Sequence, residues 1–132
     1  MKIRPLESRD IKQVVAVWTS SFSRNFDNPV YTNYLNDPNS LTLVMSDDKT
    51  IFGVASLHII KKLTRTLGLI EDVAVSNKYR GLGIGKKLVE KLIETGKKKN
   101  CDKIVLSSSE KNSEFYEKMG FQKKEFSMVI RN

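Results

Sequence analysis

A glycine-rich run between an apolar segment and a basic amphipathic segment is the feature of this sequence that most constrains its fold. The run is Arg80-Gly81-Leu82-Gly83-Ile84-Gly85-Lys86, and it follows the apolar residues 67–75. Residues 83–100 then carry apolar side chains at helical spacing, with the lysines mostly off that stripe. Glycines at a helix start let backbone N–H groups approach an anion, and the helix dipole adds partial positive charge there. The pattern predicts a strand, a phosphate-binding turn and a helix, with a pyrophosphate as the natural ligand.

Two common phosphate-binding motifs do not account for this run. The P-loop pattern G-x-x-x-x-G-K-S/T has no counterpart in the sequence at that spacing. The dinucleotide-binding pattern G-x-G-x-x-G would begin at Gly81 and requires glycine at position 86, where Lys86 stands. A start at Gly83 fails in the same way, because position 88 is Leu88. The run therefore indicates a different phosphate-binding turn, and a tight bend that binds nothing is the alternative interpretation.

The rest of the chain alternates strand and helix patterns without a repeat or a linker. Ser8 is predicted to cap a helix that runs to about Ser23, because apolar side chains recur there at helical spacing. Residues 47–49 are predicted to form the turn of a hairpin. The other predicted elements are strands at 2–5, 41–46, 50–60, 67–75 and 103–106, short helices at 30–35 and 112–119 with Gly120 as the cap, and one or two strands at 121–131. This order predicts an α/β fold, a sheet with helices on its faces, in one domain over residues 1–132.

The charge of the chain narrows the classes of partner. The 132 residues include 23 Lys and Arg against 15 Asp and Glu, a formal net charge of +8. Such a surface attracts nucleic acid, acidic lipid or a phosphorylated small molecule. No aromatic-interleaved RNA-binding surface and no zinc-finger pattern is present in the sequence, so we expect no nucleic acid as a partner. The densest lysine cluster, residues 97–99, is interpreted as a solvated helix end.

The cysteine content limits the metal sites that the chain can form, and its hydropathy indicates where in the cell we expect it. The single cysteine, Cys101, excludes an intrachain disulfide and a zinc site built on several thiolates, so we expect no metal. The sequence has no apolar run of the ~18–20 residues needed to cross a bilayer. Residues 1–7 lack the apolar stretch of a secretory signal. We therefore expect a cytoplasmic protein without membrane association.

Two motifs, taken together, resemble those of the GCN5-related N-acetyltransferase (GNAT) superfamily. Residues 80–85 are similar to its acetyl-CoA pyrophosphate loop, Arg/Gln-x-x-Gly-x-Gly/Ala. Residues 112–121, Asn-Ser-Glu-Phe-Tyr-Glu-Lys-Met-Gly-Phe, are similar to its N-x-x-F-Y-x-x-x-G-F signature. The resemblance implies the GNAT fold, a mixed central sheet flanked by helices. It also implies acetyl-CoA as co-substrate and direct attack of an amine on its thioester.

Within the superfamily, the chain from 67 to 131 is similar to the glucosamine 6-phosphate N-acetyltransferases. The similarity lies in residues 70–75, 100–104 and 115–118. It implies an amino sugar phosphate as acceptor, N-acetylglucosamine 6-phosphate as product on the route to UDP-N-acetylglucosamine, and a homodimer whose last strand exchanges contacts. Ser107 stands where that family has an acidic residue, and Asp102 where it has tyrosine. Other acceptors, namely another amino sugar, a small amine or a protein N-terminus, therefore stay open, and a non-enzymatic nucleic-acid-binding domain is the weaker alternative.

The resemblance also assigns roles around the co-substrate. It implies that the backbone of the strand Val73-Ala74-Val75 aligns the pantetheine arm and polarises the acetyl carbonyl. It places the pyrophosphate on Arg80 to Lys86, the phenol of Tyr116 at the leaving sulfur and Asn112 at a pantetheine amide. Ordinary helix packing is the alternative for Tyr116, and a helix N-cap is the alternative for Asn112.

Two adjacent carboxylates and a set of cations are the candidate residues for binding the acceptor. Glu71 and Asp72 follow each other in a predicted strand, hence point to opposite faces, so that only one can serve directly. Buried charges need partners, and a structural salt bridge is the alternative role. The resemblance places the pair at the amine, with Glu71 as proton acceptor. It places the sugar phosphate on Lys103, Arg131 and a further cation. Lys61, Lys62 and Arg65 are open for that cation, of which we take Lys62, while His58 and Cys101 are interpreted as structural.

Overall fold

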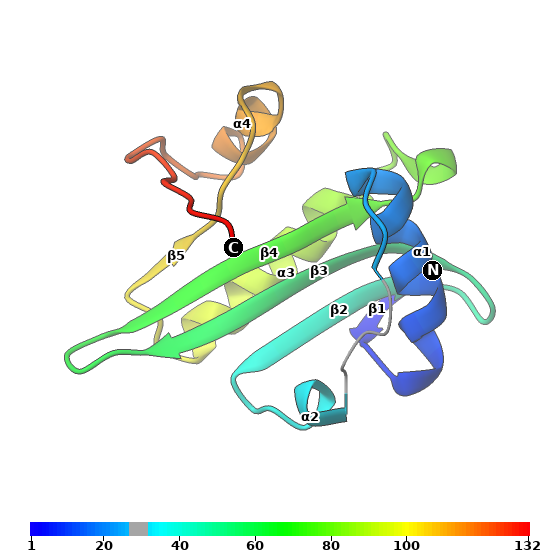
Figure 1. The fold of residues 1–132 in the computed structure, drawn as a ribbon, viewed down its shortest axis with the longest axis horizontal. Coiled ribbons are helices and arrows are strands. Elements are labelled where there is room, and N and C mark those ends of the chain that lie inside the picture. The colour runs from blue at the N-terminus through cyan, green and yellow to red at the C-terminus, as the bar shows by residue number, and fades with distance from the viewer. Residues whose placement is uncertain (27–31) are drawn as a thin grey trace.

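A five-stranded mixed sheet forms the centre of the computed structural model, which describes residues 1–26 and 32–132 (Figure 1). The spatial order of the strands equals their order in the sequence. Each of the first four strands is antiparallel to its neighbour, and the last pair is parallel. The strands are β1 (Lys2–Pro5), β2 (Ser40–Ser46), β3 (Ile51–Lys61), β4 (Thr66–Val75) and β5 (Lys103–Val105). The predicted α/β fold with a mixed central sheet is confirmed.

Two long helices cover opposite faces of the sheet (Figure 1). On one face, α3 (Ile84–Lys98) packs the buried side chains of Leu88 and Leu92 against β3 and β4. On the other face, α1 (Ile11–Phe22) packs Val14 and Val17 against β2, β3 and β4. The shorter helices are α2 (Thr32–Leu35), α4 (Glu110–Glu117) and the 3₁₀ turns η1 (Ser8–Asp10) and η2 (Asn77–Tyr79). None of the helices described here is long and apolar enough to span a membrane.

The start of α1 differs from the prediction. Ser8 is not the cap but the first residue of a 3₁₀ turn, and Glu7 stands in the capping position. Asp10 is 3% exposed and accepts hydrogen bonds from the Glu7 backbone N–H at 2.8 Å and from both terminal nitrogens of Arg4. A charge pair between β1 and the helix start takes the place of a serine cap.

The C-terminal segment also differs from the prediction. Residues 121–132 form no strand in the structure. Phe126, Met128 and Ile130 alternate along the segment and are each at least 90% exposed. The alternation that predicted a strand is thus present, but the described part of this chain provides no neighbouring strand or apolar surface for it, and a strand needs both. The helix before it is confirmed, although it begins at Glu110 rather than 112.

A bulge interrupts β4 where two carboxylates stand. The register between β3 and β4 shifts between Val54 and Ser56, so that Asp72 and Val73 stand opposite a single β3 residue. Asp72 has φ 58°, in the left-handed region. The indole Nε1 of Trp18 donates a hydrogen bond to the Asp72 carbonyl at 3.0 Å, which ties the bulge to α1. Bulges of this kind redirect backbone groups and commonly lie beside active sites.

Candidate active site

The glycine run forms an open turn at the N-terminus of α3. Gly81 and Gly83 have φ of 82° and 78°, a region that other residues rarely adopt. A Cβ built on either glycine meets no atom within 4 Å among the residues described. Gly83 is the N-cap, and no described side chain caps the helix there. The first N–H groups of α3 are therefore available to an anion, at the positive end of the helix dipole.

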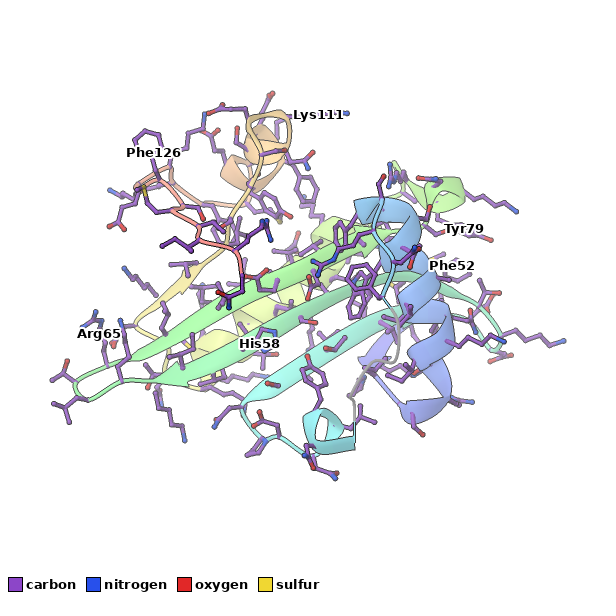
Figure 2. The ribbon with its side chains drawn as sticks, in the orientation of Figure 1. Phe52, His58, Arg65, Tyr79, Lys111 and Phe126 are labelled. Carbon is purple, nitrogen blue, oxygen red and sulfur yellow. The ribbon has the colours of Figure 1, made fainter. Side chains whose placement is uncertain are left out.

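Three contacts hold the turn to the sheet, one at the end of β4 and two at Phe52 near the start of β3. Arg80 donates from Nε to the carbonyl of Val75 at 3.2 Å. The backbone N–H of Ser76 donates to the Phe52 carbonyl at 2.9 Å. The ring of Tyr79 meets Phe52 edge to face, with centroids 4.3 Å apart (Figure 2). These contacts fix the position of the glycine run relative to the sheet before any ligand binds.

One edge of β4 is left without a strand beside the bulge. β5 pairs with β4 only at Leu67–Leu69, and within residues 1–26 and 32–132 no strand pairs with that edge beyond Leu69. In Figure 1 the chain leaves β5 and turns away from β4 toward α4. A Cβ on Gly85 lies within 3.6 Å of Val75 and Phe115, so the start of α3, the end of β4 and α4 meet at this point. The backbone groups of Val73 to Val75 thus lie between the glycine turn and α4.

Tyr116 lies on the face of α4 that packs against the core. Its ring meets Phe115 and Phe121 edge to face, with centroids 5.0 Å and 5.9 Å apart. Burial raises the pKa of the Tyr116 phenol, because the interior disfavours the phenolate. The phenol is therefore protonated at neutral pH and can donate a proton or a hydrogen bond. Packing of the ring does not involve the hydroxyl in these contacts, so the predicted role of Tyr116 at the leaving sulfur stays a prediction.

Asn112 is not the N-cap of α4. Ser109 caps the helix, and its Oγ accepts a hydrogen bond from the backbone N–H of Asn112 at 3.3 Å. The side chain of Asn112 is exposed, so its predicted contact with a pantetheine amide stays a prediction. Because Ser109 orients the first turn of α4, it indirectly sets where the Tyr116 ring lies.

The carboxylates of β4 lie on the α1 side of the sheet rather than on strictly opposite faces. Glu71 pairs with Ser56, whose neighbours along the same face of β3 include Val54 beneath α1. Asp72 sits in the left-handed conformation of the bulge, so the expected alternation of adjacent residues is wrong here. Loss of water around its carboxyl group raises the pKa of Asp72, and the charges of His58 and Arg24 act to lower it. No described cation forms an ion pair with either carboxylate, so a structural salt bridge does not explain them within the described residues.

The three predicted phosphate-binding cations are not gathered around the glycine turn. Lys62 is exposed in the connection between β3 and β4, where its N–H donates to the Arg65 carbonyl at 2.8 Å. Lys103 is exposed and pairs with Leu67 at the same end of the sheet. That end is about 30 Å from the glycine turn, because β4 spans ten residues. Arg131 is exposed in the C-terminal segment. Lys62 and Lys103 thus share one end of the sheet, and the role of all three cations stays a prediction.

Sequence reasoning missed a polar cluster beside the carboxylates. The Nδ1 of His58 lies 3.2 Å from the hydroxyl of Ser40, which in turn lies 3.2 Å from a carboxylate oxygen of Asp37. Thr42 and Ser56, both buried, form a hydrogen bond of 2.7 Å on the same face. These contacts depend on the pairing of β2 with β3, which no local motif reveals. No described group of three His, Cys, Asp or Glu residues is suited to a metal ion.

Comparison with known proteins places this geometry in a family. The family model described as acetyltransferase (GNAT) family matches residues 10–121. A glucosamine 6-phosphate N-acetyltransferase of Trypanosoma brucei brucei is 49% identical over 83 residues, which cover 61% of this chain and 56% of that protein. The chain therefore spans little more than half the length of this relative. N-alpha-acetyltransferase 30 of Saccharomyces cerevisiae is 33% identical over 132 residues, 89% of this chain and 74% of that protein.

A solved structure agrees with the whole described fold. The crystal structure of glucosamine-6-phosphate N-acetyltransferase from Arabidopsis thaliana superposes with a TM-score of 0.83 at 28% identity, covering 98% of this chain and 97% of that one. The family match includes the bulged strand, the glycine turn and α4. With most of its length inside the family model and its fold shared with a solved member, the chain belongs to the acetyltransferase (GNAT) family.

Proposed function

We propose that the protein is an acetyl-CoA-dependent N-acetyltransferase that acetylates the amine of glucosamine 6-phosphate to form N-acetylglucosamine 6-phosphate. One observation carries the activity: the uncapped glycine turn, the unpaired edge of β4 and the helix α4, which bears Tyr116, meet around Gly85. The sugar phosphate as acceptor rests on the similarity to the Trypanosoma brucei brucei and Arabidopsis thaliana proteins.

The residues of the turn suit the pyrophosphate of acetyl-CoA. Gly81 and Gly83 leave open space where a side chain would stand, and the N–H groups of Ile84 to Lys86 carry the positive end of the helix dipole. The unpaired edge of β4 at Val73 to Val75 offers backbone hydrogen-bonding groups to an extended pantetheine arm. When bound, acetyl-CoA supplies an acetyl group already activated as a thioester.

The protein's own side chains manage the protons of the reaction. An attacking amine must be neutral, so a base has to accept one proton from its ammonium form. Glu71 and Asp72 face the acceptor side and hold a cationic amine in place. Tyr116, kept neutral by burial, gives its proton to the leaving sulfur and regains one from the nitrogen, which loses its second proton as the amide forms. A preorganised N–H at the bulge stabilises the developing oxyanion at no reorganisation cost, typically by several kcal/mol.

A panel of amines tests this function by release of free thiol from acetyl-CoA. Glucosamine 6-phosphate is expected to give the highest kcat/KM, with glucosamine lower because it lacks the phosphate. If acetyl-CoA binds but no amine of the panel causes release of thiol, the N-acetyltransferase activity is contradicted. Equal rates with glucosamine and its 6-phosphate would contradict the phosphate in the acceptor.

Acetylation of a protein N-terminus is the second candidate function. The 33% identity to N-alpha-acetyltransferase 30, which covers 89% of this chain, favours it. Ser107, at a position where the resemblance to sugar-phosphate enzymes calls for an acidic residue, points the same way. The panel therefore includes a short peptide with a free amino terminus. A higher kcat/KM for the peptide than for glucosamine 6-phosphate would establish this candidate in place of the first.

Replacement of Tyr116 by Phe is expected to lower kcat about 10- to 100-fold, since general acid catalysis typically contributes that much or more. The ring contacts with Phe115 and Phe121 do not involve the hydroxyl, so the fold and the affinity for acetyl-CoA should not change. Steady-state rates and calorimetric titration with acetyl-CoA measure the two effects. An unchanged kcat would mean that the sulfur receives its proton from another group.

We also propose a homodimer in which the C-terminal segments pair. Residues 126–130 have the alternating apolar pattern of a strand, yet those side chains face solvent in the isolated chain. A second copy supplies the two things the segment lacks, a neighbouring strand and an apolar surface. Pairing of this kind would also bring Arg131 toward the partner's acceptor site, which gives that cation a place in the proposed reaction.

Sedimentation equilibrium tests the dimer. The wild-type protein is expected at twice the 15.1 kDa mass of one chain. Phe126→Glu should shift the mass toward one chain, because it places a charge on the apolar side of the segment. Ser127→Glu is the matched control on the opposite side and should leave the dimer intact. A monomeric wild type at assay concentrations would contradict the proposal.

A further inference from the structure

The sheet face that α1 covers at one end carries a polar cluster further along, next to the β4 carboxylates. Val54, Ser56 and His58 alternate along β3 and so share this face, with Val54 beneath α1. The β2 partners on the same face are Thr42 opposite Ser56 and Ser40 opposite His58. Figure 2 labels His58 on β3, the strand between β2 and β4. No role described so far uses its imidazole.

The hydrogen bonds of His58 determine which ring nitrogen is basic. Ser40 has one hydroxyl proton, and it donates that proton to Oδ2 of Asp37, an acceptor only. The Ser40 oxygen must then accept from His58, so the 3.2 Å contact places the imidazole proton on Nδ1. Nε2 is left with its lone pair. Asp37 is itself held by the backbone N–H of Asn39 at 2.8 Å, which keeps the row Asp37–Ser40–His58 in order.

The imidazole of His58, which carries Nε2, lies on the same side of the sheet as Glu71 and Asp72. Ser56, two residues before His58, pairs with Glu71, and the charge of His58 acts on the carboxyl group of Asp72. The ring of Tyr34 lies 6.1 Å from the imidazole and edge on, and the charge of Arg24 also acts on Asp72. Glu71 and Asp72 thus lie toward one side of the ring, and Asp37 lies behind Ser40 on the other.

We propose that His58 is the proton acceptor for the attacking amine, with Ser40 and Asp37 as positioning residues. This rests on the proposed acetyl transfer but not on the identity of the amine. The ammonium group loses one proton to Nε2 of His58, which gives a neutral amine and an imidazolium. The imidazolium returns that proton to water after the product leaves, so no further reactant is needed. Glu71 and Asp72 then hold the cation rather than take its proton.

Replacement of His58 by Asn tests the proposal. The Asn side chain can keep the hydrogen bond to Ser40 but cannot bind a proton. We expect kcat to fall about 100-fold at pH 7, within the usual range for a lost general base, with KM for the amine changed less. The deficit should shrink as pH rises, because the amine then loses its proton to solvent. Imidazole added to His58→Ala should restore activity in proportion to its neutral form, which a purely structural residue would not allow.

Tyr34→Phe is the matched control, because it removes a hydroxyl bonded to Thr42 and leaves the ring beside His58. Its kcat should stay close to that of the wild type. The best amine of the panel is used throughout, whichever it is. If the wild type transfers acetyl groups and His58→Asn keeps the wild-type kcat and pH profile, the role of His58 is refuted while the proposed function stands. If the wild type acetylates no amine, both are refuted together.

Discussion

Replacement of Gly83 by Asp is expected to reduce the affinity for acetyl-CoA at least 100-fold, close to the limit of calorimetric detection. Gly83 is the N-cap of α3 and has φ 78°, and a side chain there would point into open space. Asp is one of the few residues that tolerate this backbone region, so the turn should keep its shape. The new carboxylate would stand where the pyrophosphate is proposed to bind, and a 100-fold loss corresponds to about 2.8 kcal/mol of repulsion and lost contacts.

Two measurements distinguish a loss of acetyl-CoA binding from misfolding of the variant. A negative charge at a helix N-terminus favours the helix, so the unfolding temperature should be close to that of the wild type. Gly83→Asn has nearly the same shape without the charge, and its affinity should lie between the other two. An affinity of Gly83→Asp within about threefold of the wild type would rule out the glycine turn as the site of the pyrophosphate.

Replacement of Asp10 by Ala is expected to lower the free energy of unfolding by about 3 kcal/mol. The Asp10 carboxylate is bound by Arg4 through two contacts of 2.6 Å and 2.9 Å and by the Glu7 N–H at 2.8 Å, and it is 3% exposed. Removal of one partner leaves a largely buried guanidinium and a backbone donor without compensation. For a domain of this size, the loss corresponds to a fall in Tm of about 10 °C.

The same contacts predict how stability depends on pH. The hydrogen bond from Arg4 lowers the pKa of Asp10 in the folded protein. The unfolded chain therefore binds this proton first, and the contribution of Asp10 is complete above its ordinary pKa of 3.8 and is lost as pH falls through the lower folded value. Thermal unfolding of wild type and Asp10→Asn between pH 2 and 7 should show curves that converge at the acidic end.

An exposed ion pair is the control for the buried one. Glu94 pairs with Lys91 and Lys98 on the outer side of α3, at 3.4 Å and 3.2 Å. Glu94→Gln is expected to leave Tm unchanged within error, because water screens exposed pairs. Equal losses in Asp10→Ala and Glu94→Gln would mean that burial of the Arg4–Asp10 pair contributes nothing specific.

The glycine turn and the packing of α3 and α4 could be predicted from the sequence because their causes are local. The glycines at 81 and 83 are needed for their own backbone angles, and the apolar stripe of 84–93 follows from the helical period. Tyr116 was found because its neighbours form a short contiguous motif. Each of these depends on residues within about ten positions of one another.

The acceptor side could not be predicted in the same way. Asp72 takes a left-handed conformation because the bulge, tied to Trp18 of α1 54 positions away, overrides the preference of an aspartate in a strand. His58 meets Ser40 only through the register of two strands. A sequence pattern marks which residues are apolar or charged, but not which distant strand lies opposite them.

The sequence by itself determined the α/β class, the glycine turn and the amphipathic pattern of the helix behind it, because glycine angles and apolar periods act over short stretches of chain. Only the tertiary structure decided that Glu71, Asp72 and His58 share one side of the sheet, that Lys62 lies far from the glycine turn, and that residues 121–132 have no strand to join. These are consequences of pairing between distant segments, and such pairing is set by the packing of the whole sheet rather than by any motif within it.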